Sequence, residues 1–223
     1  MKYKKELIKN IHGTHHEIPK QMFKDKPLTV ADLKQINQKF MGGGMSQNYF
    51  AIPWFEYYFD THNFEYVVEI GSQKGALSTY FANMAAVKET FIFDTYELYP
   101  DKHWFSRADE GTGHWFEQLS NISPYINHHY ENTFTRSTYN HIKENMDQFK
   151  TFIFCDGGDK VRELNMYAPL LKKDDRIAVH DWNMEIGPTQ VAPIMNENNL
   201  IYEEPFATSA TDLETWIMPF KKE

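Results

Sequence analysis

The chain has 223 residues, of which 41% are hydrophobic and 24% are charged, and its formal net charge is −8. This length suffices for a single buried core, and the composition excludes a disordered, collagen-like or membrane-spanning chain. Because negative charge repels a phosphate backbone, nucleic acid is not an expected partner.

The cysteine content and the apolar runs bear on where the protein works. Its single cysteine, Cys155, excludes an intramolecular disulfide and a zinc site built from cysteines. No apolar run approaches the roughly 20 residues needed to span a bilayer, and the polar N-terminus lacks the apolar core of a signal peptide. The sequence therefore predicts a cytoplasmic protein with no membrane partner.

The polar start of the chain is typical of an extension. A helix follows over about residues 30–41, because Thr29 and Asp32 have the spacing of a capping box and apolar residues continue at helical spacing. Three consecutive glycines then stop this helix. We expect an N-terminal extension and helix over residues 1–41 and one folded domain over residues 42–223.

From residue 65 onward, short strand-like runs alternate with helical segments. Such alternation predicts a mostly parallel sheet with helices on both faces, which is a doubly wound, Rossmann-like α/β fold. Two strand-like runs at 200–206 and 213–220, joined by a short polar connection, predict an antiparallel hairpin at the end of the sheet. The expected strands are 65–70, 89–94, 125–130, 150–156 and 176–181, and the expected helices are 76–86, 135–148 and 160–172.

The expected strands end in acidic or glycine-containing turns. Ligands of an open α/β sheet bind outside the carboxyl ends of the strands, so these turns are candidates for a site. Gly71 permits a tight turn after Glu69, and Gly75 lets the following helix pack closely. Gln73 stands where a dinucleotide fingerprint needs glycine, which argues against a pyrophosphate on this turn.

A further acceptor follows the second expected strand. Asp94 stands where a carboxylate would hold the two ribose hydroxyls of a nucleoside, and Glu97 is the alternative if the loop bends. A structural role for Asp94, as a helix cap or turn residue, stays open.

Three stretches carry a resemblance to a known family. Residues 152–160, 167–172 and 177–182 resemble the small-molecule O-methyltransferases grouped with cephalosporin hydroxylase-like and macrocin O-methyltransferase-like proteins. The acidic-x-Gly-x-x-x-Gly pattern of residues 69–75 is similar to the first motif of class I S-adenosylmethionine (SAM)-dependent methyltransferases. The resemblance covers about residues 42–185.

This resemblance implies a class I methyltransferase fold with SAM as cofactor. The methionine part of SAM would then lie near the first turn, the ribose on Asp94 and the adenine near Asn132. Gly71→Val is expected to abolish cofactor binding while leaving the fold largely intact. The implied cofactor-binding residues are Glu69, Gly71, Ser72, Gly75, Asp94, Asn132, Asp156 and Gly157.

In metal-dependent members of the family, acids that end the fourth and fifth strands hold a divalent cation. Here these acids would be Asp156 and Asp181, with His180 or Asp159 nearby, and oxygen ligands suit magnesium, manganese or calcium. Two converging carboxylates without a partner would repel, which favours a cation between them. The alternative is that Asp156 accepts loop amides and Asp181 caps the following turn, with no ion present.

The candidate catalytic residues are His180, Asp181 and Lys160. A neutral His180 could take the proton from an acceptor hydroxyl, because an unperturbed imidazole has a pKa of about 6.5. The alternative is a core or turn histidine that is hydrogen-bonded to a neighbouring loop. Lys160 could act as a base only if its surroundings lower its pKa. Asp174-Asp175 stands where the family usually has glycine, which leaves the geometry of that turn open.

The leading hypothesis is methyl transfer from SAM to a hydroxyl of a small molecule, with positioning as the main source of catalysis. A nicotinamide-dependent oxidoreductase and a non-catalytic nucleoside-binding module are the alternatives. The oligomeric state stays open, a homo-oligomer included.

Overall fold

The computed structural model describes residues 51–71, 77, 81, 89–93, 126–129 and 132–223, and these residues are built around one sheet of seven strands in the order β3-β2-β1-β4-β5-β7-β6. The strands are β1 (Tyr66–Ile70), β2 (Glu89–Phe93), β3 (Ile126–His129), β4 (Thr151–Cys155), β5 (Arg176–Val179), β6 (Leu200–Tyr202) and β7 (Met218–Lys222). The helices are α3 (Ala51–His62), α6 (Arg136–Met146), α7 (Lys160–Tyr167), the 3₁₀ turn η3 (Ala168–Leu170), α8 (Pro188–Asn198) and α9 (Phe206–Asp212).

The first five strands are parallel, and β7 runs antiparallel between β5 and β6. Ile70 on β1 is in register with Cys155 on β4, which is in register with Val179 on β5. These three strands therefore end at the same edge of the sheet. The predicted mostly parallel sheet with an antiparallel C-terminal part is confirmed.

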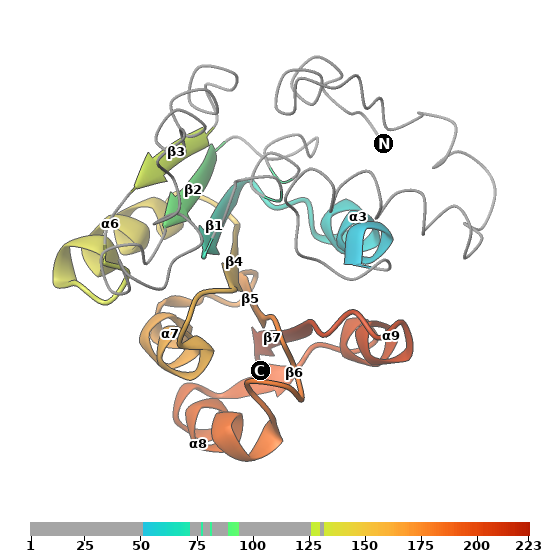
Figure 1. Cartoon of the computed structure of the whole chain (residues 1–223). Helices are drawn as coiled ribbons and strands as arrows, with labels where there is room; N and C mark the ends of the chain where they lie inside the picture. Colours follow the sequence, from blue (N-terminus) through green and yellow to red (C-terminus); the bar gives the residue numbers. More distant parts are fainter. Residues whose placement is uncertain (1–50, 72–76, 78–80, 82–88, 94–125, 130–131) are drawn as a thin grey trace, which may run out of the picture.

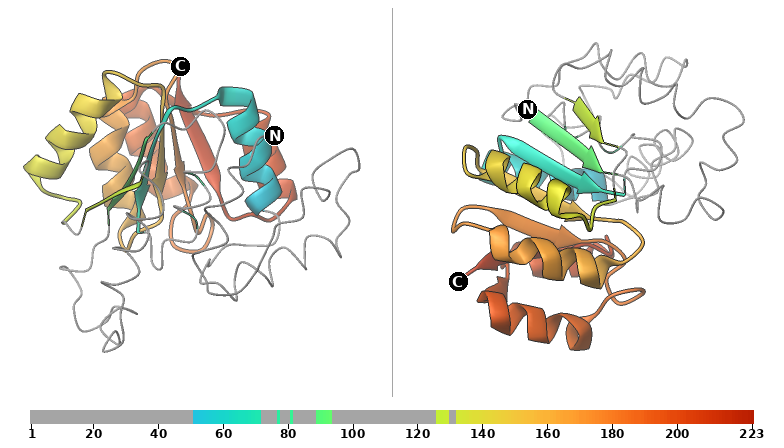
Figure 2. Two further views of the ribbon diagram at one scale, coloured as in Figure 1. Left: turned by 90° about the horizontal axis from the view of Figure 1, so that it is seen from above. Right: turned by 90° about the vertical axis from the view of Figure 1, so that its left-hand side faces the viewer.

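Helices cover both faces of the sheet, as predicted. Figure 1 looks along the sheet, with β3 at one end and β6 at the other. In Figure 2, α6, α7 and α8 lie on one face, whereas α3 and α9 lie on the other. The two helices α3 and α9, distant in sequence, contact each other.

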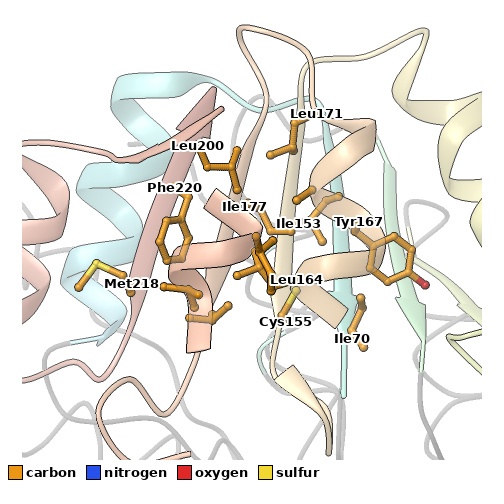
Figure 3. Packing of buried hydrophobic residues seen from close by; sticks show 14 of the residues in the cluster. Ile70, Ile153, Cys155, Leu164, Tyr167, Leu171, Ile177, Leu200, Met218 and Phe220 are labelled. Atoms are coloured by element: carbon orange, nitrogen blue, oxygen red, sulfur yellow. The ribbon is translucent and has the colours of Figure 1, made fainter. Parts of the chain in front are cut away.

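Alternating residues of the central strands supply two cores. Val67 and Phe152 face the α3 side, where the rings of Phe55, Tyr58 and Phe59 pack against Phe152. The intervening positions (Tyr66, Val68, Ile70, Ile153 and Cys155) face the α7 side and join a larger hydrophobic cluster. Figure 3 shows Ile70, Ile153 and Cys155 within this cluster. Burial on both faces explains why these strands are almost continuously apolar.

The C-terminal hairpin was predicted correctly as an antiparallel pair but wrongly as a pair with a short connection. Phe206, expected to end a strand, begins α9 instead. This helix is stabilised by tertiary packing: Phe206 and Ala210 are buried against α3, and the indole N–H of Trp54 donates to the Phe206 carbonyl at 3.2 Å. The remaining strand of the pair is short, since β6 ends at Tyr202.

The turn before β5 is fastened by a side chain. The buried carboxylate of Asp175 accepts hydrogen bonds from the backbone N–H groups of Thr151, at 2.8 Å, and Lys172, at 3.0 Å. Burial raises the pKa of Asp175, and these two bonds act in the opposite direction. Asp175 thus joins the turn to the start of β4, and this sequence needs no glycine there.

Several expectations lie outside the described residues, among them the helix at 30–41, the boundary after residue 41 and most of the helix at 76–86. Leu77 and Phe81 are described, and both are helical and buried in the α3-side core. Among the described residues no helix combines the length and the apolar character that a bilayer crossing requires.

Candidate functional site

Three polar strand ends meet at the carboxyl edge of the sheet. Backbone hydrogen bonds between neighbouring strands continue for one residue past the ends of β4 and β5. The Asp156 N–H donates to Ile70 O at 2.9 Å, and the His180 N–H donates to Cys155 O at 3.0 Å. Gly71, Asp156 and His180 are thereby placed side by side, as the sequence predicts. Ser72, Gly75 and Asp94 lie outside the described residues, so their cofactor roles stay predictions.

Gly71 is required where two loops cross. Its φ is +88°, and a Cβ there would lie 2.3 Å from the Asp156 carbonyl oxygen and 2.6 Å from the Gly157 nitrogen. The expectation that Gly71→Val leaves the fold intact is therefore wrong, because the side chain would strike the backbone of the neighbouring loop. Glu69, two residues before Gly71 on β1, is buried, with 1% of its surface exposed.

The loop between β4 and α7 is organised by Glu163, a residue that the sequence interpretation missed. Its carboxylate accepts the N–H groups of Gly157, at 3.2 Å, and Asp159, at 3.4 Å. Burial raises the pKa of Glu163 to about 7, against the lowering effect of the Gly157 bond. Asp159 caps α7 by accepting the N–H of Arg162 at 3.1 Å. The Gly157 amide is thus engaged within its own loop.

His180 is fixed by Asp156. Its Nδ1 lies 2.8 Å from Asp156 Oδ1, and 7% of the side chain is exposed. Burial lowers the pKa of His180, but the charge and hydrogen bond of Asp156 outweigh burial and raise it above the ordinary value. The Nε2 atom is buried and has no hydrogen-bond partner among the described residues. The bond to Asp156 is compatible with both hypotheses for His180, a turn histidine and a catalytic base. They differ in whether a neighbouring loop or the substrate pairs with Nε2.

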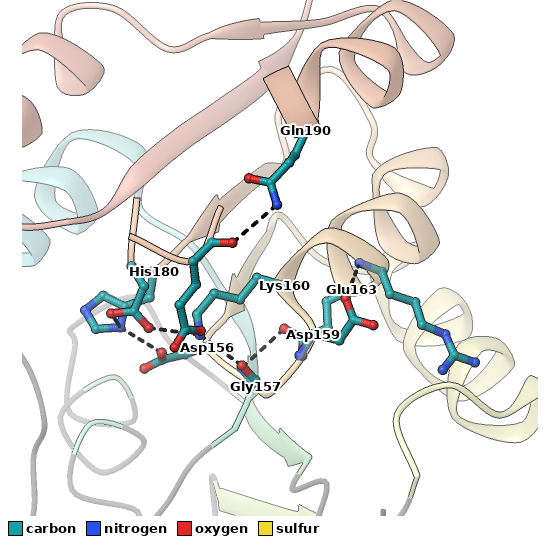
Figure 4. Close-up of polar contacts among 10 residues, drawn as sticks. Asp156, Gly157, Asp159, Lys160, Glu163, His180 and Gln190 are labelled. Carbon is teal, nitrogen blue, oxygen red and sulfur yellow. Dashed lines mark hydrogen bonds and ion pairs between the residues drawn. The ribbon is translucent and has the colours of Figure 1, made fainter. Parts of the chain in front are cut away.

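Lys160 lies close to Asp156 and His180 (Figure 4). Its ammonium is 2.9 Å from Asp181 Oδ2, 2.7 Å from Glu185 Oε2 and 3.0 Å from the Gly157 carbonyl oxygen. Burial lowers the pKa of Lys160, but Asp156, Glu185 and Asp181 together raise it above the ordinary range. The condition for Lys160 as a base, a lowered pKa, is not met. We call Asp156, Lys160, His180, Asp181 and Glu185 the strand-end cluster.

Asp181 lies in a turn whose backbone it helps to close. Its φ is +54°, and its carbonyl accepts the N–H groups of Met184, at 2.9 Å, and Glu185, at 3.0 Å. Its carboxylate lies 3.4 Å from His180 Nδ1 as well as next to Lys160. The premise that Asp156 and Asp181 converge without a partner is therefore wrong, since a histidine and a lysine accompany them.

Nitrogen and oxygen atoms of Asp156, His180 and Asp181 all lie within 4.8 Å of one another, a spacing that one metal ion could bridge. The predicted metal ligands are thus brought together. The acid Glu185, which no motif signalled, completes the acidic surroundings of Lys160.

Searches against known proteins give a consistent structural likeness. A candidate O-methyltransferase from Klebsiella pneumoniae superposes with a TM-score of 0.53 at 13% identity, over 92% of this chain and 93% of its own. The SAH-bound methyltransferase PaMTH1 of Podospora anserina gives 0.52 at 11% identity, over 93% and 90%. CmcI with Mg and SAM gives 0.53 at 13% identity, over 75% and 69%. The chain has the Rossmann-like methyltransferase fold. No protein-family model and no curated protein sequence matches it.

In this methyltransferase fold, Asn132 follows β3 at the same edge of the sheet. Its Oδ1 accepts the N–H of Phe134 at 2.9 Å, and its carbonyl accepts the hydroxyl of Thr138 at 3.1 Å. These bonds hold the turn that leads into α6. The structure gives Asn132 this turn role, and contact with an adenine stays a prediction.

A groove of about 320 Å³ opens beside the loop that follows Asp181. Trp182, the next residue, forms one wall, and its ring meets that of Tyr202 edge-on with centroids 6.0 Å apart. The lining combines these two rings with oxygen-bearing side chains from α9 and the segment before it (Glu204, Thr208, Thr211 and Asp212). Apolar walls with a few polar groups are typical of small-molecule sites.

Proposed function

We propose that this protein is a SAM-dependent methyltransferase that transfers a methyl group to a hydroxyl of a small molecule. The observation that carries the proposal is the buried Nε2 of His180, which has no hydrogen-bond partner within the part of the chain that the structure describes and lies at the carboxyl edge of a sheet with the methyltransferase strand order, on a ring held by Asp156. An unpaired buried acceptor is unfavourable unless a ligand pairs with it.

The bond to Asp156 assigns roles to the two ring nitrogens. Because a carboxylate only accepts, Nδ1 carries the proton in this bond, and neutral His180 presents Nε2 as a bare acceptor. An acceptor hydroxyl next to Nε2 would donate its proton there as its oxygen becomes nucleophilic. Asp156 holds the ring in place and stabilises the imidazolium that results.

The described residues fit a cofactor at the first turn. Gly71 begins this turn with a left-handed backbone conformation that brings it against the loop after β4, and the buried carboxylate of Glu69 lies just before it. When bound, SAM supplies the electrophilic methyl group. Ser72, Gly75 and Asp94 are the remaining proposed cofactor-binding residues, together with Asn132, Asp156 and Gly157.

We assign the groove beside Trp182 to the acceptor. Its link to the strand-end cluster is through the chain: Trp182, which lines the groove, directly follows Asp181, whereas no member of the cluster lines it. The adjoining rings of Trp182 and Tyr202 would give an apolar surface to a ring-shaped molecule, and the four oxygen-bearing side chains would accept or exchange hydrogen bonds with hydroxyl groups.

A divalent cation fits this arrangement poorly. CmcI has a structure with Mg and SAM, and Asp156, His180 and Asp181 are close enough to share an ion. However, Asp181 is paired with the Lys160 ammonium, and Asp156 Oδ1 faces the proton on His180 Nδ1. An added dication would stand beside an ammonium and displace these bonds. We therefore place no catalytic step on a metal.

A nicotinamide-dependent oxidoreductase is disfavoured by topology. The dinucleotide-binding sheet has six parallel strands in the order 3-2-1-4-5-6, whereas here an antiparallel β7 lies between β5 and β6. The absence of the second glycine at Gln73 points in the same direction.

The test compares ligands and then measures transfer. In thermal unfolding, a ligand at 100 times its dissociation constant stabilises a protein by about 2.7 kcal/mol, so SAM and SAH should raise the Tm and NAD(P)H should not. Methyl-labelled SAM with a panel of small hydroxylated acceptors should then give a labelled product. Stabilisation by NAD(P)H alone would overturn the proposal, and SAH binding without transfer to any acceptor would favour a non-catalytic module.

A further inference from the structure

The Lys160 ammonium is fully hydrogen-bonded inside the strand-end cluster. It has three N–H donors and three acceptors within 3.0 Å: Asp181, Glu185 and the Gly157 carbonyl. Only 5% of the side chain is exposed, so solvent contributes little to its neutralisation. The protein therefore supplies the counter-charges for this cation itself.

Lys160 stands at an unfavourable position on its helix and depends on nearby acids for its charge to be stable there. Lys160 is the first residue of α7, directly after the cap Asp159. The N-terminus of a helix is the unfavourable end for a positive charge. A lysine buried at this end needs carboxylates that outweigh both the helix dipole and desolvation, and Asp181 and Glu185 provide them at ion-pair distance.

The loop after β5 is shaped to deliver the second of these acids. Asp181 and Asn183 both have positive φ, and Asn183 N–H donates to Ile186 O at 2.8 Å. Gln190 Nε2, from α8, lies 3.4 Å from the Glu185 carbonyl oxygen (Figure 4). The loop thus closes on itself and turns the Glu185 carboxylate onto Lys160, although this side chain is otherwise 61% exposed.

We propose that Lys160 is the resident cation of the strand-end cluster and takes the place of a divalent metal. The proposal rests on the proposed function. Lys160 neutralises Asp181 and leaves Asp156 to orient His180, which are the electrostatic tasks a metal would otherwise perform at these acids. Methyl transfer then needs no divalent ion, and an ion binds only when the ammonium is removed.

Manganese binding to the whole chain tests this directly, by calorimetry and by the electron paramagnetic resonance of free Mn²⁺. Wild type should show no saturable binding in the millimolar range. Lys160→Met removes the charge with a side chain of similar length, and it should bind Mn²⁺ at least about tenfold more tightly than wild type. Lys160→Arg keeps the charge and should behave as wild type does.

Two further variants make the result specific. Lys173→Met, an exposed lysine on the turn before β5, should not change Mn²⁺ binding. Lys160→Met combined with Asp181→Asn should lose the binding gained in the single variant. If Lys160→Met does not fold, wild type and Lys160→Arg still test the proposal, and both should show no tight Mn²⁺ binding. Tight Mn²⁺ binding by wild type that is lost in the single variant Asp181→Asn would overturn it.

Activity gives an independent arm. Wild-type methyl transfer should be unchanged by EDTA, and a loss restored by Mg²⁺ or Mn²⁺ would also overturn the proposal. Failure of the proposed function would look different: SAH would then not bind in calorimetry, whereas the Mn²⁺ results for wild type and Lys160→Met would still report on the cation.

Discussion

Among the described residues, two groups of charged side chains differ in how their acids are paired: one lies around Glu203 and the other is the strand-end cluster. Glu203, with 2% exposure, accepts from the Tyr58 hydroxyl at 2.5 Å, from Arg176 Nε, and lies 3.2 Å from His62 Nε2. Burial raises the pKa of Glu203, but these three partners outweigh burial and lower it. We call Glu203, Tyr58, His62 and Arg176 the Glu203 cluster: one buried acid lies between three partners and ties α3 to β5 and the end of β6.

The strand-end cluster is arranged differently. Its acids meet a lysine and a histidine, yet His180 Nε2 has no partner among the described residues. Asp181 and Glu185 also keep partial exposure, at 23% and 61% of their side chains. His62 Nε2 also makes no hydrogen bond among the described residues, but it lies 3.2 Å from the Glu203 carboxylate, whereas both ion pairs of His180 are made by Nδ1. We therefore expect the Glu203 cluster to serve stability and the strand-end cluster to serve ligand binding. The following predictions test this contrast.

The largest effect is expected at His180. His180→Gln should lower kcat by about 10²–10⁴-fold, because a positioned general base contributes on that scale. SAH affinity and Tm should change little. The matched control is His62→Gln in the Glu203 cluster, which should lower Tm and leave kcat near wild type. Steady-state kinetics and thermal unfolding of both variants decide, and equal kcat values would remove His180 from the chemistry.

Next in size is the loss of the Glu203 carboxylate. Glu203→Ala leaves the partly buried Arg176 without its partner, and breaking a buried ion pair typically destabilises by about 3–5 kcal/mol. Urea unfolding measures this effect. Glu197→Gln, an exposed acid on α8, should stay within about 0.5 kcal/mol of wild type. A small loss at Glu203 would mean that the Glu203 cluster is not a source of stability.

Glu163 should make stability depend on pH. Its pKa in the fold is raised to about 7 from 4.5, so the native state binds the proton more tightly than the unfolded state does. Stability should therefore fall as the pH rises from about 4.5 through 7, by up to about 3 kcal/mol. Glu163→Gln should flatten this slope in urea unfolding at pH 5 to 8. An unchanged slope would show that Glu163 is charged throughout.

The smallest effect is a shift in the pH profile. Asp156 raises the pKa of His180, so Asp156→Asn should lower that pKa and move the acid limb of kcat/KM to lower pH. The sign follows from the base role, since His180 must lose its proton to act. Asp174→Asn, an exposed acid in the turn before β5, should leave the limb in place. A shift to higher pH would contradict the assignment.

The elements that recur along the chain, strands alternating with helices, could be predicted from the sequence. Alternation of apolar strands with helices yielded the sheet, and the rule of carboxyl-end ligands brought Gly71, Asp156 and Asp181 to one edge. The sequence did not predict α9, because Phe206 ends a strand-like run and the residues after it have the composition of a polar connection; this segment becomes helical while packing on α3. Nor did it predict α8, whose hydrophobic pattern is weak and which contains Pro193.

The partners of polar side chains were the least predictable part of the site. Glu163, Asp175 and Glu185 are acids that composition assigns to solvent, yet Glu163 and Asp175 accept loop amides and Glu185 binds Lys160. The Lys160 pairs join loops that are 21 and 25 residues away along the chain, to Asp181 and Glu185. No local spacing reports such contacts, because the order of the strands in the sheet creates them.

Because β7 lies between β5 and β6, it also sets the order in which the strands can join the sheet. β6 pairs only with β7 among the described strands, and β7 follows it in the chain. During synthesis β6 therefore leaves the ribosome before its hydrogen-bonding neighbour exists, and β5 has an open edge until β7 inserts. A chain cut after Ile217 would lose two strands from the sheet rather than one, and the edge of β5 next to the strand-end cluster would be left open for pairing with another chain.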